Sequence, residues 1–138
     1  MSATPSASFA DIDIQVLKDK SLKELVDAAV RFDPTSTEDI LEKIQHRDQI
    51  GSTEVAPGFF IPHVVTDSVP RIQLVLGTEG EVTWLLVLMP SNAVPESKRA
   101  LSLLMRQLAY EEEVSRIRSF SSTEQFQHYL AVIERRDQ

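Results

Sequence analysis

Two nearly uninterrupted apolar runs near the middle of the chain constrain the fold more than any other feature. They are Ile72–Leu76 and Val82–Met89, and a turn around Gly77 and Gly80 separates them. A strand with one wet face alternates apolar and polar residues, whereas these runs are apolar on both faces. They therefore predict central strands that helices cover on two sides, which is the layered arrangement of an α/β domain.

Shorter strand patterns lie on both sides of these runs in the sequence. Ile12, Ile14 and Val16 alternate within Phe9–Leu17, and this alternation predicts an edge strand. The segment Phe59–Val65 is also apolar and β-branched, with Pro62 interrupting it. We therefore expect a single domain built on a mixed β-sheet of about four to five strands, flanked by helices on both faces.

Helical periodicity and capping signals predict where these helices lie. Ser21 with Glu24, Thr35 with Glu38 and Ser121 with Glu124 have the spacing of capping boxes. Apolar residues at helical spacing follow each box, and two more helices are expected between the last strand and the third box. The expected helices are Leu22–Phe32, Thr35 to about Arg47, Glu96–Tyr110, Glu111–Ile117, and a last helix after Ser121.

Length and composition limit the chemistry that the chain can perform. Its 138 residues suit one domain, which we place at residues 9–138 after a flexible N-terminal tail of small, uncharged residues at 1–8. The chain has no cysteine, which excludes disulfides, thiolate nucleophiles and sulfur-based zinc sites and suits a cytoplasmic protein. The reactive candidates are carboxylates, hydroxyls, basic residues and three histidines, His46, His63 and His128.

Charge and hydropathy narrow the classes of partner. Fourteen basic and 21 acidic residues give a net charge of −7, which opposes nucleic-acid binding. The longest apolar stretch, Trp84–Pro90, is far short of the roughly 20 residues that a membrane helix needs, so we expect no membrane insertion. The acidity serves solubility or the docking of a basic partner, and the sequence leaves both open.

The segment Gly51–His63 contains too many special residues for a plain connection. It begins just after the helix that ends near Arg47, and Pro62 stiffens the backbone immediately before His63. A histidine aimed from a rigid strand end suits nucleophilic attack or proton transfer. The residues alone fit equally well a buried, hydrogen-bonded core histidine. Arg47 at a helix C-terminus and Ser52-Thr53 in a turn likewise have structural explanations.

The joint spacing of these residues resembles a known family. Gly51-Ser52-Thr53, Gly58 and Ile61-Pro62-His63 together resemble the enzyme IIA domain of the bacterial phosphotransferase system, of the fructose/mannitol and nitrogen-regulatory type. The similarity extends over about Leu22–Leu130, including Arg47 with its acidic neighbour Asp48.

This resemblance implies a phosphocarrier that needs no metal and no cofactor. His63 would accept a phosphoryl group from an HPr-type carrier. The protein would then pass the group to a IIB domain, or keep it as a regulatory mark that a target protein recognises. Arg47 would stabilise the phosphate, and Ser52, Thr53 and Ser97 would donate hydrogen bonds to it. His46 and His128 would have no part in the reaction.

The sequence also departs from the family pattern. Ser97 stands where the family has a second histidine, and Glu54 and Ala56 replace loop glycines. Val64-Val65 makes the surroundings of His63 more apolar than in the family. We favour a regulatory, nitrogen-type phosphocarrier. A sugar-specific enzyme IIA and a degenerate IIA-like module that works only by binding stay open.

Overall fold

The two apolar runs form the centre of the sheet in the computed structural model, which describes residues 6–137. They are strands β5 (Gln73–Glu79) and β6 (Val82–Met89), an antiparallel pair joined by a tight turn. Strand β1 (Asp13–Lys18) pairs with β5 in parallel and forms one edge. The edge strand expected near the N-terminus is therefore confirmed.

The opposite side of β6 pairs with short strands. Strands β3 (Phe59–Phe60) and β4 (His63–Val65) both run parallel to β6, one after the other in a continuous register. Strand β2 (Glu54–Ala56) pairs with β3 in the antiparallel direction. The mixed sheet has six strands within the described residues, because Pro62 divides one expected strand into two and β2 adds another.

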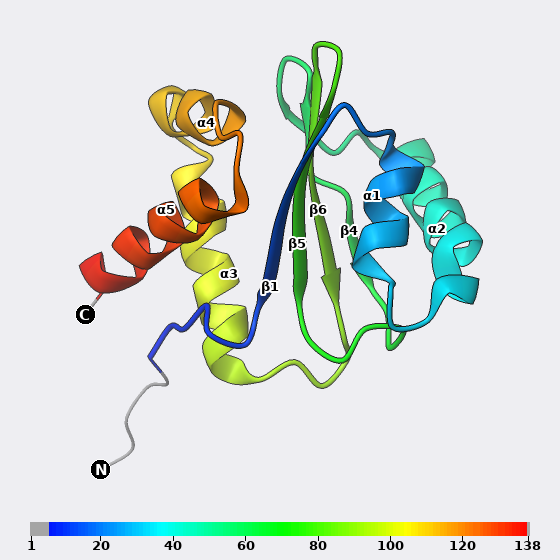
Figure 1. Ribbon diagram of the computed structural model, residues 1–138, viewed down its shortest axis with the longest axis horizontal. Helices are drawn as coiled ribbons and strands as arrows, with labels where there is room; N and C mark the ends of the chain where they lie inside the picture. Colours follow the sequence, from blue (N-terminus) through cyan, green and yellow to red (C-terminus); the bar gives the residue numbers. More distant parts are fainter. Residues whose placement is uncertain (1–5, 138) are drawn as a thin grey trace.

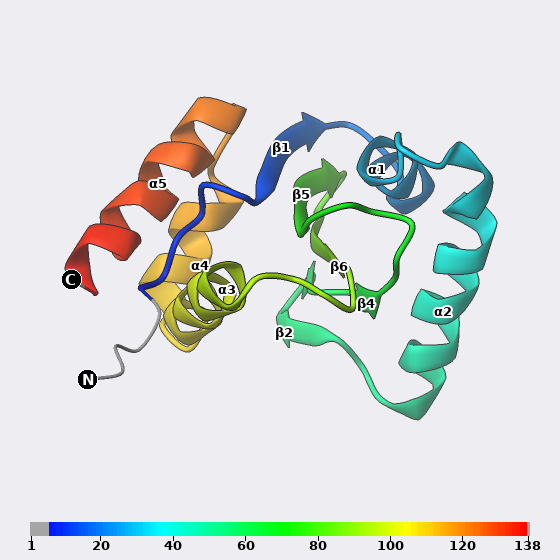
Figure 2. The same cartoon turned by 90° about the horizontal axis from the view of Figure 1, so that it is seen from below.

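Helices cover both faces of this sheet, as expected (Figures 1 and 2). Helices α1 (Leu22–Ala29) and α2 (Thr37–Ile50) lie on one face, with the 3₁₀ turn η1 (Pro34–Ser36) between them. Helices α3 (Pro95–Gln107), α4 (Glu111–Arg118) and α5 (Thr123–Arg136) lie on the other. Among residues 6–137, no helix combines the length and the hydrophobicity that crossing a membrane requires.

The hydrophobic core consequently has two parts, one on each face of the sheet. Leu74, Leu76, Leu85 and Val87 face the layer of α3 to α5. The intervening residues Val75, Leu86 and Leu88 face α1 and α2. All seven side chains are at most 1% exposed, which confirms that β5 and β6 are buried on both faces.

A glycine sets the close approach of α1 to the sheet. A Cβ atom at Gly77 of β5 would overlap the fully buried side chain of Leu25. Helix α1 begins with the expected capping box: Ser21 Oγ accepts from the N–H of Glu24, and Glu24 Oε1 accepts from the N–H of Ser21. The helix ends three residues before the expected Phe32.

The other two expected capping boxes are wrong. Thr35 lies in η1 and donates from Oγ1 to Asp33 Oδ1, while α2 begins only at Thr37 and has no side-chain cap. The last helix is capped one residue later than expected, by Ser122 with Gln125. Pro34 favours the 3₁₀ turn in the first case, and two overlapping serine boxes compete in the second.

The expected N-terminal tail lies only partly within the described residues. Residues 1–5 lie outside them. Ala7 is buried, and the N–H of Ser8 donates to the carbonyl of Glu96 at 3.0 Å.

Candidate functional site

His63 is exposed at one edge of the sheet. It is the first residue of β4 and pairs with Val87 of β6, and the N–H of Val87 donates to the carbonyl of Pro62 at 2.9 Å. Val64 points into the core beneath α1 and α2, so strand alternation directs His63 to the opposite face, on the side of α3. The exposed position removes the alternative of a buried core histidine.

The imidazole is also electronically suited to act as a nucleophile. The side chain reaches solvent, but the surrounding protein partly desolvates the ring, and this desolvation lowers the pKa of His63 below its usual 6.5. Burial disfavours the charged form of a histidine, so the ring is mainly neutral near pH 7. A neutral imidazole has the free nitrogen lone pair that attack on phosphorus requires.

Arg47 and the segment 51–53 reach the same sheet edge from α2. Helix α2 packs beside β4, and Figure 2 shows the chain passing from the end of α2 to β2 near this strand. Arg47 donates from Nη1 to the carbonyl of Gly51 at 2.9 Å, and it forms no ion pair with any residue in 6–137. The guanidinium of Arg47 therefore holds the start of this segment through one hydrogen bond, and no carboxylate among the described residues pairs with its charge.

Thr53 and Ser52 are fixed by short-range hydrogen bonds. The carbonyl of Thr53 accepts from the N–H of Ile61 at 3.0 Å, which connects this segment to the residue two positions before His63. Ser52 Oγ accepts from the N–H of Glu54 at 3.0 Å. These bonds link the end of α2, through Gly51 and Thr53, to the segment that leads into β4. That Arg47, Ser52 and Thr53 contact a phosphate on His63 stays a prediction.

Glu54 and Ala56, which replace family glycines, fit without strain. Both lie in β2, and among the described non-glycine residues only Asp19 has a positive φ. Glu54 Oε2 accepts from the N–H of Gly58 at 2.9 Å, so this carboxylate is used inside the β2–β3 hairpin. The positive φ that the hairpin needs is supplied by Gly58, with φ 74°.

Ser97 lies at the start of α3, in a cavity that His63 does not line. It is 3% exposed in the first turn of α3 and lines a cavity of about 380 Å³ together with Arg71, Ile72 and Asn92. These neighbours come from the segment that enters β5 and from the loop after β6, and no residue of β4 lines this cavity. A hydrogen bond from Ser97 to a phosphate on His63 stays a prediction.

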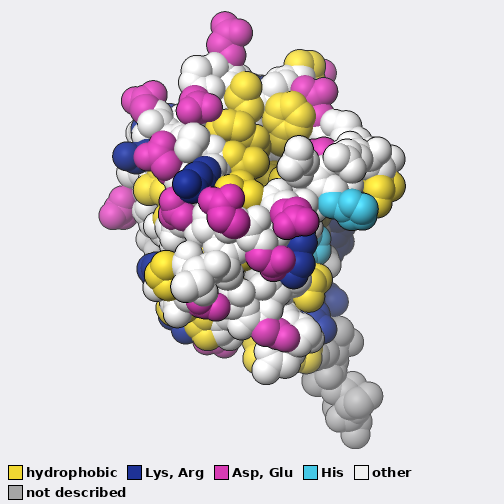
Figure 3. All heavy atoms as spheres, turned by 90° about the vertical axis from the view of Figure 1, so that its right-hand side faces the viewer, with side chains coloured by type: hydrophobic (Ala, Val, Ile, Leu, Met, Phe, Trp, Pro, Cys, Tyr) yellow, Lys and Arg dark blue, Asp and Glu magenta, His cyan; other side chains and the backbone are white. Residues whose placement is uncertain are grey.

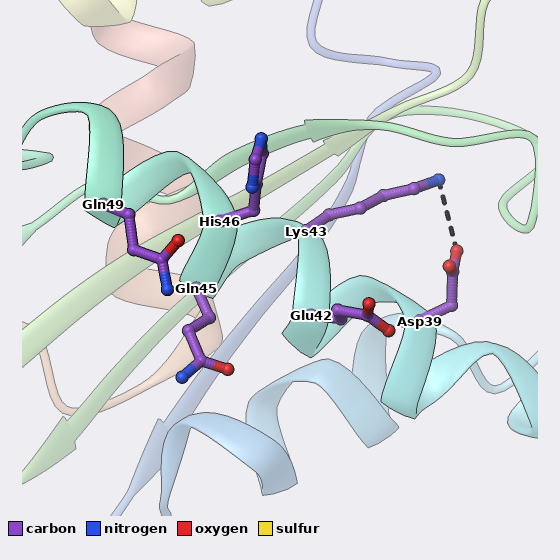
Figure 4. Close-up of a pocket in the computed structure, with 6 residues that line it drawn as sticks. All are labelled: Asp39, Glu42, Lys43, Gln45, His46 and Gln49. Carbon is purple, nitrogen blue, oxygen red and sulfur yellow. Dashed lines mark ion pairs between the residues drawn. The ribbon is translucent and has the colours of Figure 1, made fainter.

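The remaining two histidines lie on helices, His46 on α2 next to Arg47 and His128 on α5. His46 is exposed on α2, where it lines a shallow cavity whose six lining residues all come from that one helix (Figure 4). The Lys43–Asp39 ion pair in this cavity, at 3.2 Å, is a solvated pair one turn apart. His128 is exposed on α5. Within residues 6–137 no group of three or more metal-binding side chains is assembled.

Two residues that the sequence did not single out support the site. Asp67, four residues after His63, accepts from both the N–H and the Oγ of Ser91 at 2.9 Å. The backbone bond and then the hydroxyl bond lower the pKa of Asp67, and they attach the loop before α3 to the end of β4. Arg118 of α4 donates to the carbonyls of Pro57 at 2.7 Å and Glu81 at 3.1 Å. No short sequence pattern marks these contacts, because they join segments far apart in the chain.

Comparison with known proteins agrees with this architecture. The sequence profile of the family described as "Phosphoenolpyruvate-dependent sugar phosphotransferase system, EIIA 2" matches residues 7–132. The crystal structure of nitrogen regulatory protein IIA-Ntr from Neisseria meningitidis is similar with a TM-score of 0.58 and 21% identity, over 90% of this chain and 95% of that chain.

A second similar structure is the solution structure of the mannitol-specific cryptic phosphotransferase enzyme IIA CmtB from Escherichia coli. Its TM-score is 0.51 at 17% identity, over 88% of this chain and 92% of that chain. No curated protein sequence gives a significant match. Since the family profile covers almost the whole chain, the protein belongs to the type 2 enzyme IIA family of the phosphoenolpyruvate-dependent sugar phosphotransferase system.

Proposed function

We propose that this protein is a phosphohistidine carrier that accepts a phosphoryl group from an HPr-type carrier on His63. The observation that carries the proposal is the position of this ring: it is exposed on a hydrogen-bonded strand edge, and desolvation lowers its pKa. The ring is therefore accessible to a partner and mainly neutral at pH 7, and β6 fixes the backbone that carries it.

The transfer needs little more than orientation and charge stabilisation. A lone pair of the His63 imidazole attacks phosphorus while the bond from phosphorus to the donor imidazole breaks, and that electron pair returns to the donor. The transition state spreads negative charge over three oxygens. Arg47 supplies a permanent positive charge at this edge, and the hydroxyls and N–H groups of Ser52 and Thr53 supply further donors. We do not include Ser97 among these donors, because no residue of β4, the strand that carries His63, lines the cavity in which Ser97 lies.

We further propose that the role is regulatory rather than sugar-specific transport, in the cytoplasm. The family's second histidine is replaced by Ser97, so the protein lacks a second imidazole that could tune fast onward transfer to a IIB domain. A module that works only by binding is disfavoured, because the Glu54 carboxylate is occupied by the N–H of Gly58. The nucleophile and the arginine are both retained.

The experiment is phosphoryl uptake from phosphoenolpyruvate through enzyme I and an HPr-type carrier. We expect about one phosphoryl group per chain in the wild type, none in His63→Ala, and unchanged uptake in the matched variants His46→Ala and His128→Ala. Arg47→Met should slow uptake by about 10- to 1000-fold. Uptake by His63→Ala, or no uptake by the wild type from any HPr-type carrier, would contradict the proposal.

Two further measurements refine the assignment. Because the pKa of His63 is lowered, the ring loses its nucleophilic form only below the usual value of 6.5. The acceptor side of the uptake rate should therefore be flat from pH 8 to pH 7 and fall only below about pH 6.5. Rapid transfer from the phosphorylated protein to a member of a IIB panel would show sugar transport instead of regulation.

A further inference from the structure

A groove lies between the last two helices, α4 and α5. Its volume is about 180 Å³, and α4 contributes Arg116 to its lining, while the connection between the helices contributes Phe120. The lining residues of α5 recur every three or four positions and so share one face of that helix; they are Gln125, His128, Tyr129, Val132, Ile133 and Arg136. The groove is therefore a seam within the helical layer.

The floor of this groove is apolar and closely packed. The ring centroids of Phe120 and Tyr129 are 5.5 Å apart, and the side chains of Tyr129 and Ile133 are buried. Val132 is partly buried beside them. An apolar cavity of about 150 Å³ can hold benzene, whereas the pocket of a drug-sized ligand occupies about 300 to 1,000 Å³. The groove therefore has room for a single aromatic or branched group.

The ionisable groups around this floor are basic, although the chain has a net charge of −7. Arg116, His128 and Arg136 line the groove, and none of the described aspartates and glutamates does. Arg136 and His128 form no ion pair within residues 6–137. Acidic side chains are instead spread over other surfaces, such as the α1 and α2 side that faces the viewer in Figure 3. The groove is thus a local site of positive charge, which favours an anion.

The carboxylate of Glu113, beside the groove, is already engaged. Its Oε2 accepts from the hydroxyl of Tyr129 at 3.1 Å and pairs with Arg116 at 3.8 Å. Burial and this carboxylate raise the pKa of Tyr129, while the charges of Arg116 and Arg136 lower it. Both guanidinium groups therefore act on the same hydroxyl. Since Arg116 neutralises Glu113, the charge of Arg136 remains available to a ligand.

The groove is separate from the strand that carries His63. Helix α5 contacts β1, and Thr123 Oγ1 at its start accepts from the N–H of Val16 at 3.1 Å. Strand β1 forms one edge of the sheet, and β5 and β6 lie between β1 and β4. Figures 1 and 2 both show α5 and β4 on opposite sides of β1 and β5. A ligand in the groove therefore does not meet a phosphoryl group on His63.

We propose that this groove binds a small carboxylate that bears one aromatic or branched apolar group. The apolar group lies on Phe120, Tyr129 and Val132, and its removal from water supplies affinity. The carboxylate accepts a bidentate pair of hydrogen bonds from the guanidinium of Arg136, whose planar fork matches its geometry. A ligand that lacks the ring or the charge loses one of these two sets of contacts.

Binding is measured by NMR titration of the isotope-labelled protein with four small probes. Hydrocinnamate has both the ring and the carboxylate, its amide lacks the charge, the corresponding amine reverses the charge, and propionate lacks the ring. We expect hydrocinnamate to give saturable shifts of backbone amide signals in α4 and α5, with a dissociation constant of millimolar order for a ligand of about ten non-hydrogen atoms. The amide should bind about three- to tenfold more weakly, and the amine and propionate should give no saturable shift there.

Two neighbouring arginines of α5 provide a matched pair of variants. Arg136 lines the groove, whereas Arg135 does not, and both are exposed in the last turn of the helix. Arg136→Gln should weaken the binding of hydrocinnamate about three- to tenfold, because an exposed charge contact is lost. Arg135→Gln should bind like the wild type. Both variants remove one positive charge, so a difference between them does not come from the net charge.

Four results would overturn the proposal. They are the absence of a saturable hydrocinnamate shift in α4 and α5, equal binding of its amide, equal binding of propionate, and an equal loss of binding in both arginine variants. The titration needs no phosphoryl donor, and His63→Ala should bind hydrocinnamate like the wild type. Failure of this proposal and failure of the phosphocarrier proposal are therefore distinguishable.

Discussion

The contact of Gly58 with Arg118 allows a quantitative test of how the β2–β3 hairpin is held beside the site. Gly58 has φ 74°, and a Cβ atom there would lie 3.1 Å from the carbonyl oxygen of Glu81 and 3.2 Å from Nη2 of Arg118. Gly80 has a similar φ of 60°, but a Cβ atom there would meet no atom within 4 Å beyond its two chain neighbours. The two glycines therefore differ in surroundings and not in backbone strain.

The expected magnitudes follow from this difference. Gly80→Ala should lower the free energy of unfolding by about 1 kcal/mol, the cost of a left-handed alanine. Gly58→Ala carries the same cost and also displaces Arg118 from the carbonyls of Pro57 and Glu81. Since Arg118 is partly exposed, the loss of these bonds adds about 1 kcal/mol, for a total of about 2 kcal/mol.

Urea unfolding followed by circular dichroism measures both values, and a double-mutant cycle isolates the contact. In an Arg118→Met background, the difference between Gly58→Ala and Gly80→Ala should shrink to about 0.5 kcal/mol or less, because the displaced bonds are already absent. Equal destabilisation by the two glycine variants in the wild-type background would refute the reasoning.

Two other predictions concern the scaffold. Asp13 anchors the N-terminal end of β1 through hydrogen bonds from Arg71 and Gln73. Burial raises the pKa of Asp13, but these bonds outweigh burial and lower the pKa below 3.8. The stabilisation by the Asp13 carboxylate is therefore present above about pH 4 and is lost as the pH falls through the lowered pKa. Asp13→Asn should lower the free energy of unfolding by about 1 to 2 kcal/mol at pH 7 and make it less dependent on pH below pH 4. A free energy of unfolding that falls with pH below 4 as steeply in the variant as in the wild type would contradict this. Gly77→Val should lower the free energy of unfolding by about 1 to 3 kcal/mol, because the new side chain overpacks against Leu25. Urea unfolding measures this value, and an unchanged free energy would show that α1 moves away from the sheet without cost.

The sheet was predictable because its signals are local. Continuous apolar runs identified β5 and β6, and the alternation of Ile12, Ile14 and Val16 identified the edge strand. The predicted starts of α2 and α5 were wrong for different reasons. At α5 two overlapping sequences compete. Ser121–Glu124 and Ser122–Gln125 both fit a capping box, and the structure uses the second. The start of α2 depends on a tertiary bond, in which Thr37 donates from Oγ1 to Asp27 of α1 at 2.6 Å.

The candidate site was only partly predictable. The sequence places His63 after a proline on a strand, but exposure depends on that strand lying at the sheet edge, which no local pattern reveals. Arg47 and Thr53 were assigned from the family motif that also contains His63, and their contact with a phosphate stays a prediction. Ser97 was assigned from alignment alone; it lines a cavity to which no residue of β4 contributes, and its part in phosphate binding stays a prediction.

The most direct measurement of the central claim is the location of the phosphoryl group on the protein. After incubation with phosphoenolpyruvate, enzyme I and an HPr-type carrier, peptides generated under alkaline conditions are analysed by tandem mass spectrometry. We predict one acid-labile, base-stable phosphate, located on His63 and absent from His46 and His128. A phosphate on another residue, or a protein that carries none while the HPr-type donor is phosphorylated, would contradict the account.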